Sequence, residues 1–118
     1  MKDEKDILHE VEGVKAQVIL CGHTHAPRVV QLYDGRLIIN PGSVGLPTYD
    51  DDTPNYHAMQ TYSALSSYAI LEKLDSHWYA ELLKVPYDYH LAVEEAHRNG
   101  RDDWEQWLAT GRAYRTNT

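Results

Sequence analysis

The chain lacks several features that would place it in a special class of protein. It has 118 residues, one cysteine and no phenylalanine. The single Cys21 cannot form an internal disulfide, which excludes a small disulfide-stapled domain. No apolar run approaches the roughly 20 residues that cross a bilayer. The acidic N-terminal stretch has no signal-peptide core, so we expect a cytoplasmic protein without a membrane partner.

Positive charge is also scarce. Eleven lysines and arginines face eighteen aspartates and glutamates, which gives a net charge of −7. Such a surface repels a phosphate backbone, so we expect no general nucleic-acid binding. A phosphate-bearing substrate would need a cation supplied at its site. The composition, 42% hydrophobic and 25% charged, is that of an ordinary globular protein, and the length suffices for one domain or part of one.

The pattern of apolar residues predicts an α+β chain built mainly from antiparallel hairpins, with helices at the C-terminal end. A continuous apolar run is typical of a strand covered on both faces, as in the first expected strand. Asp34-Gly35 and Asp75-Ser76 each separate two β-rich runs, which predicts two hairpins. The expected strands are 16–21, 28–33, 36–40, 66–74 and 77–85, and the expected helices are 6–13, 91–98 and 103–110.

Two stretches between the strands read as irregular. Residues 40–47 form a shaped loop, because Pro41 has no amide donor and Gly42 and Gly45 permit positive φ. Residues 48–64 are polar and rich in tyrosine, and they show no clear periodicity. We therefore expect a long surface excursion there.

Two histidines, His23 and His25, follow the first apolar strand with one residue between them. Imidazole is a preferred ligand of zinc, manganese, iron and nickel, and a loop that leaves a rigid strand can aim two side chains. Gly22 would permit close backbone approach, and Thr24 would only space the two rings. Two solvent-facing histidines at a strand end are the alternative.

The segment "CGHTHAP", followed after a hairpin by "INPGSVGLP", resembles the C-terminal half of the calcineurin-like metallophosphoesterases, in particular the small bacterial and archaeal phosphodiesterases. The resemblance implies an αββα sandwich of which residues 1–118 form the C-terminal half. It also implies two divalent cations (Mn, Fe, Zn or Ni) at the strand ends and a metal-bridging hydroxide that attacks phosphorus. His23 would bind the second metal and His25 the first. The supporting loop residues would be Gly22, Asn40, Gly42 and Ser43.

The sequence departs from that family at its N-terminal side. The family motifs Asp-x-His, Gly-Asp and Gly-Asn-His do not occur in residues 1–21, where His9 is the one histidine and is expected on a helix surface. Two neutral imidazoles cannot offset two doubly charged cations. We therefore interpret the chain as a truncated phosphoesterase, or as a half-domain completed by another chain. Alone it would have little activity, and its incomplete metal site could be occupied or empty.

Whether the chain is an enzyme stays open at this point. Loss of the metals would turn the same fold into a non-catalytic scaffold that binds proteins. If the site is completed, the partner is a phosphate-ester substrate. Because the remaining elements cannot cover both faces of residues 16–21, we also expect association, either as a homo-oligomer or with the missing N-terminal half.

Several other residues have both a chemical and a plain interpretation. We expect Cys21 in the core rather than as a thiolate ligand, and Asp50, Asp51 and Asp52 as a solvated acidic loop rather than as metal ligands. His57 is expected at the surface rather than as a general acid. Packing, rather than stacking on a nucleobase, is expected for Tyr49, Tyr56 and Tyr62. Trp104 and Trp107, three residues apart, are expected to anchor the last helix to the sheet. Arg28 fits a phosphate contact and a surface ion pair equally well.

Overall fold

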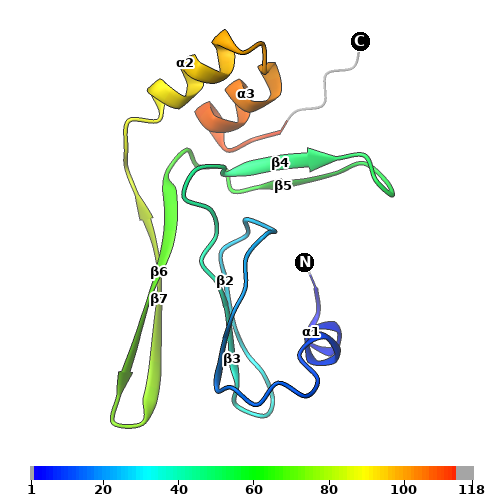
Figure 1. Cartoon of the computed structure of the whole chain (residues 1–118), viewed down its shortest axis with the longest axis vertical. Coiled ribbons are helices and arrows are strands. Elements are labelled where there is room, and N and C mark those ends of the chain that lie inside the picture. The colour runs from blue at the N-terminus through cyan, green and yellow to red at the C-terminus, as the bar shows by residue number, and fades with distance from the viewer. Residues whose placement is uncertain (1, 114–118) are drawn as a thin grey trace.

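The structure, a computed structural model, describes residues 2–113. Its elements are α1 Glu4–Glu10, β1 Val18–Leu20, β2 Arg28–Gln31, β3 Leu37–Asn40, β4 Thr48–Asp51, β5 His57–Gln60, β6 Ser66–Leu74, β7 His77–Val85, α2 His90–Arg98 and α3 Asp102–Thr110. Antiparallel strand pairs and C-terminal helices confirm the expected α+β class (Figure 1).

The strands form three separate sheets within the described part of the chain. One sheet has the order β1-β3-β2, with β1 parallel and β2 antiparallel to β3, and the hairpins β4–β5 and β6–β7 are two-stranded. The radius of gyration is 16.7 Å and the extents are 50 × 33 × 18 Å. A compact domain of this length would have a radius of about 13–14 Å. The chain is therefore spread out, and its hydrophobic contacts form small clusters.

The main cluster joins α1 to the β1-β3-β2 sheet. Its buried members are Ile7, Leu32 and Ile38, and Leu8, Val11, Ile19 and Val30 pack against them. The helix begins two residues before the expected start, because the Asp3 carboxylate rather than Asp6 caps it and accepts the Asp6 N–H at 3.0 Å. The apolar positions thus seat α1 against the sheet whose strand β1 leads into the segment with the two histidines.

The hairpin that Asp34-Gly35 predicts is confirmed as β2–β3, but its loop is longer than the expected two residues. The loop holds three residues, 33–35, and the Leu32 N–H donates to the Arg36 carbonyl at 2.9 Å across it. Gly35 has φ +90, as such a loop requires. The Arg36 side chain, hydrogen-bonded to Asp34, lowers the pKa of that carboxyl.

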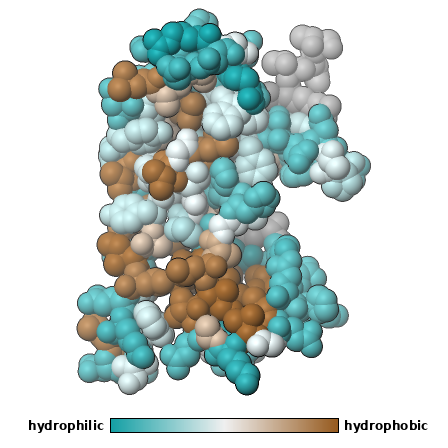
Figure 2. All heavy atoms as spheres, viewed as in Figure 1, coloured by the Kyte–Doolittle hydropathy of each residue, from teal (hydrophilic) through white to brown (hydrophobic). Residues whose placement is uncertain are grey.

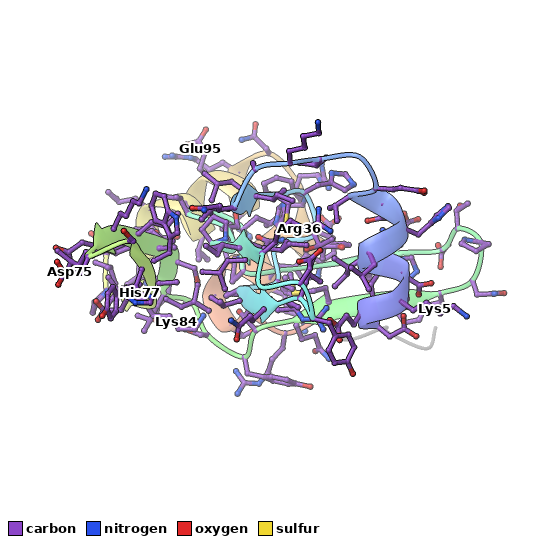
Figure 3. All side chains as sticks on the ribbon, turned by 90° about the horizontal axis from the view of Figure 1, so that it is seen from below. Lys5, Arg36, Asp75, His77, Lys84 and Glu95 are labelled. Atoms are coloured by element: carbon purple, nitrogen blue, oxygen red, sulfur yellow. The ribbon has the colours of Figure 1, made fainter. Side chains whose placement is uncertain are left out.

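The second expected hairpin, β6–β7, is confirmed with the predicted bounds. Asp75 and Ser76 form its two-residue turn with φ values of 49 and 67, the left-handed pair that this kind of turn uses. Figure 3 labels Asp75 and His77 at this turn, on the opposite side of the view from Lys5 and α1. The ribbon pairs with no other strand in the described residues.

The expectation of an irregular excursion at residues 48–64 is wrong, because this segment contains the β4–β5 hairpin. Thr48 is fully buried, and its hydroxyl donates to the Met59 carbonyl. The C-terminal segment supplies further partners, since the Ala113 N–H donates to the Gln60 side chain at 2.9 Å. A polar strand pair needs no apolar alternation when neighbouring segments satisfy its hydrogen bonds, which is why the sequence pattern missed it.

The two C-terminal helices lie where the apolar pattern predicts them. Trp107 and Leu108 are buried, α3 packs on α2 and contacts β4, and Gly111 ends α3 in a left-handed conformation. Trp104, expected to help anchor the helix, is instead 37% exposed beneath the Arg101 guanidinium, so Trp107 carries the anchoring.

The first strand is shorter and more exposed than expected. β1 covers three residues, Leu20 is 65% exposed, and Cys21 is exposed. The expectation of Cys21 in the core is therefore wrong, whereas the exposed Leu20 agrees with the expectation that the other elements cannot cover both faces of residues 16–21. Figure 2 shows the consequence, since hydrophobic atoms gather on the visible face over this sheet.

None of the helices in the described residues has the length and apolar character required to span a membrane.

Arg36 ties the β2–β3 turn to the end of α1 (Figure 3), and its removal tests this connection. The Arg36 side chain is 18% exposed, and its guanidinium donates to the Val11 carbonyl at 3.2 Å and the Val14 carbonyl at 2.9 Å. We expect Arg36→Met to lower the free energy of unfolding by about 1–2 kcal/mol, because it orphans these carbonyls. The matched control Arg101→Met removes an exposed ion pair with Asp103 and an exposed contact with the Trp104 ring, and should lower the free energy of unfolding in urea much less. Equal losses would contradict the connection.

Candidate metal-ligand site

The end of β1 runs directly into the segment that holds the two histidines, residues 21–27, called here the histidine loop. The Cys21 N–H donates to the Ile39 carbonyl at 2.9 Å and is the last link between β1 and β3. The Thr24 N–H then donates to the Gly22 carbonyl at 2.9 Å, which closes a tight turn around His23. The rigid sheet thus ends within two residues of the first imidazole.

Both histidines have left-handed backbone, with φ 75 at His23 and φ 63 at His25. Positive φ is uncommon outside glycine and costs free energy unless the surroundings hold it. Two such residues on either side of one threonine indicate a loop whose path is imposed by contacts. His23 is exposed and His25 is partly buried.

The ring of His25 is fixed by two neighbours. Its Nδ1 lies 3.0 Å from the Leu46 carbonyl, which can only accept, so Nδ1 carries a proton and the neutral ring has its lone pair on Nε2. The Tyr49 ring meets it edge-on, with centroids 5.5 Å apart and planes at 73°. This arrangement resembles the hydrogen bond to a backbone carbonyl that orients the imidazole rings of metal-binding histidines.

A buried asparagine joins the histidine loop to residues 40–47, the glycine loop. Asn40 is 6% exposed, and its Nδ2 donates to the Thr24 hydroxyl at 2.8 Å. Its Oδ1 accepts the Gly42 N–H at 3.0 Å. Thr24 was expected only to space the histidines, and this contact corrects that interpretation.

The glycine loop is also tied to β6. Ser43 accepts the Leu46 N–H at its hydroxyl and the Ser67 N–H at its carbonyl, both at 3.0 Å. Gly42 has φ +86, and a Cβ there would lie 2.8 Å from Cγ of Pro27 and 2.9 Å from Cβ of Ser67. The histidine loop, the glycine loop and β6 therefore meet at this glycine.

Gly22 differs from its expected role. A Cβ built on it would meet no atom of the described residues within 4 Å, so nothing in this part of the chain requires close approach there. It borders a hollow of about 340 Å³ at the start of the histidine loop. The hollow is lined by Leu20, Cys21, Gly22, Ile39, Pro41, Ala69 and Leu71.

The other candidate residues are held by local contacts. The exposed His57 ring lies 2.9 Å from the Asn55 carbonyl, and Asp51 accepts the Thr53 N–H. Arg28 donates to the Lys2 carbonyl at 2.7 Å, a contact that neither of its two interpretations included. Across residues 2–113, no three histidine, cysteine, aspartate or glutamate side chains gather closely enough to hold a metal ion. The acidic residues 50–52 therefore do not join the two histidines in a ligand cluster.

Comparison with protein-family models gives one match. The model described as the calcineurin-like phosphoesterase superfamily domain matches residues 1–64, more than half of the chain. The chain belongs to the calcineurin-like phosphoesterase superfamily. The match includes both the histidine loop and the glycine loop of this phosphoesterase chain. No curated protein sequence matches it.

Calcineurin-like phosphoesterases generally use divalent metals, and the donor set described here does not fit such a group by itself. His23 and His25 are neutral ligands, and the described residues bring no carboxylate to them. A pair of divalent cations needs anionic oxygen ligands to offset its charge. Residues 2–113 of this phosphoesterase thus supply two imidazoles and a framework for them, but no closed metal site.

The junction at Gly42 can be tested by adding one methyl group. Gly42→Ala should lower the free energy of unfolding by at least about 1–2 kcal/mol, since a left-handed alanine is strained even without a clash. The contacts with Pro27 and Ser67 add to that loss. Gly45→Ala, in the same loop, meets open space without positive φ and is the control. If both variants unfold at the same urea concentration as the parent chain, the proposed junction does not exist.

Proposed function

We propose that this chain contributes the imidazoles of a metal-dependent phosphoesterase site whose remaining ligands come from residues outside it. In this proposal residues 1–118 are part of a cytoplasmic phosphodiester- or phosphomonoester-hydrolysing domain, and His23 and His25 each serve one cation. The observation that carries the proposal is the histidine loop itself, in which two left-handed histidines follow β1 and the buried Asn40 holds the residue between them.

The backbone of the loop favours this function over a protein-binding scaffold. Left-handed residues other than glycine persist where surrounding structure holds them, and they concentrate at functional sites. A scaffold without metals has no chemical need for two such histidines, nor for a hydrogen bond that leaves Nε2 of His25 available. The scaffold remains the second candidate because no third metal-ligating side chain joins them in the described chain.

The free edge of β1 indicates where the missing ligands would enter. The Leu37 N–H donates to Gln17 and the Cys21 N–H donates to Ile39, so the backbone groups of Val18 and Leu20 point away from β3. A further strand parallel to β1 at this edge would end beside the histidine loop. Carboxylates that follow such a strand would supply the charge that two imidazoles lack.

The same edge supports self-association when the chain is alone. Leu20 is 65% exposed beside an apolar hollow, and an unpaired strand edge readily pairs with another chain. A second copy would cover this surface without adding carboxylate ligands to the histidines. We therefore propose a homo-oligomer for the isolated chain.

Metal binding by the isolated chain tests the incomplete site. We expect titration calorimetry with Mn²⁺ to show no pair of tightly held ions, and an aryl phosphodiester to remain unhydrolysed, since the anionic ligands are missing. Weak binding should disappear in the His23→Ala/His25→Ala double variant but persist in His9→Ala, whose side chain is exposed on α1. Two tightly bound ions and turnover by the chain alone would refute incompleteness. Weak binding unchanged in the double variant would refute the ligand assignment.

Solution scattering tests the proposed association. We expect the parent chain to scatter as a dimer or larger species, and Leu20→Lys to shift it toward monomer, because charge on an edge strand opposes pairing. The control is Val29→Lys, which places the same charge on β2 at the opposite edge of the sheet, where the parent side chain is 40% exposed. A monomeric parent chain, or an equal shift in both variants, would count against the β1 edge.

A further inference from the structure

We infer that Thr24 is a positioning residue, whose hydroxyl, held by the Asn40 amide, sets the backbone path that directs both histidines. This inference rests on the proposed function for its purpose, because it concerns how the two imidazoles are aimed. The contact itself joins the exposed tip of the histidine loop to the buried last residue of the central strand β3.

Hydrogen-bond logic fixes the direction of this contact. The Gly42 N–H can only donate, so the atom of Asn40 that faces it at 3.0 Å must be the carbonyl oxygen. The amide nitrogen must then face Thr24, 2.8 Å away, and the threonine hydroxyl must accept from it. Asparagine is suited to this position because one amide donates to one loop and accepts from the other.

The position of Thr24 makes the hydroxyl effective. Thr24 stands between two left-handed residues, and its own N–H closes the turn around His23. The hydrogen bond from Asn40 holds the hydroxyl as well, so both the backbone and the side chain of Thr24 are fixed between the two histidines. The left-handed conformations of His23 and His25 then have less freedom to relax toward the ordinary right-handed or extended regions.

The exposure of Thr24 distinguishes a role in positioning the loop from a role in packing the core. The Thr24 side chain is exposed, so its hydroxyl contributes little to hydrophobic packing. Thr24→Val removes the acceptor while keeping the branched shape, and Thr24→Ser keeps the acceptor. Both variants should therefore fold, and they should differ only in the histidine loop and at the Asn40 side chain that contacts it.

The experiment compares these two variants with the parent chain of residues 1–118 by nuclear magnetic resonance, without added metal. The probes are the Cα and Hα chemical shifts of His23 and His25, the ring-nitrogen shifts of His25, and the Asn40 side-chain amide signals. We expect Thr24→Ser to reproduce the parent spectrum. Thr24→Val should shift or broaden the signals of both histidines and of the Asn40 side-chain amide, while the backbone amides of β2 and of residues 37–39 in β3 stay unchanged.

Each other outcome overturns the inference. Histidine and Asn40 signals that coincide in Thr24→Val and the parent would show that the hydroxyl sets nothing. Failure of Thr24→Ser to restore the parent signals would show that the methyl group matters instead. Unfolding of Thr24→Val alone would make the hydroxyl a requirement of the whole fold. Because no metal is present, a negative result in the metal titration leaves this test unaffected, so the two proposals fail separately.

Discussion

The pairing of β3 on both sides is the constraint on which the rest of the described structure depends. β3 is the central strand of its sheet, parallel to β1 and antiparallel to β2, and it contributes Ile38 to the core and the almost fully buried Ile39. Its last residue, Asn40, extends this rigidity beyond the sheet through one amide. The histidine loop and the glycine loop are therefore both attached to the best-packed strand of the chain.

The histidine loop and the glycine loop, held by Asn40, lie next to apolar surface that no other part of the described chain covers. The backbone of both histidines is held in an uncommon conformation, while a few residues earlier Leu20 is largely exposed and the edge of β1 has no partner strand in residues 2–113. A radius of gyration of 16.7 Å, above that of a compact domain of this length, expresses the same condition. The chain belongs to the calcineurin-like phosphoesterase superfamily, yet its described residues offer only two imidazoles as metal ligands. These two findings are compatible if residues outside the chain complete the site.

Much of the fold was predictable where the physical signal is local. Asp75-Ser76 between two alternating runs gave the bounds of β6 and β7, because a two-residue turn with left-handed residues leaves little choice of register. The β4–β5 hairpin was not predictable in this way. The C-terminal segment supplies hydrogen bonds to that polar strand pair from residues about 50 positions away in the sequence. Cys21 was predicted in the core because its neighbours in the sequence are apolar. Apolar neighbours do not show whether another layer of structure covers the strand, and Cys21 is in fact exposed.

The sequence by itself determined the pair His23 and His25, the family to which they point, and the glycine at position 42, because residue type and spacing carry that information directly. Only the tertiary structure decided that Asn40 holds Thr24, that Leu46 fixes the proton on His25, and that Gly42 touches Pro27 and Ser67. These contacts join residues 15 to 25 positions apart, and their partners depend on how β3 and β6 bring the loops together in space. A pattern along the chain records which side chains are available, whereas packing selects the ones that meet.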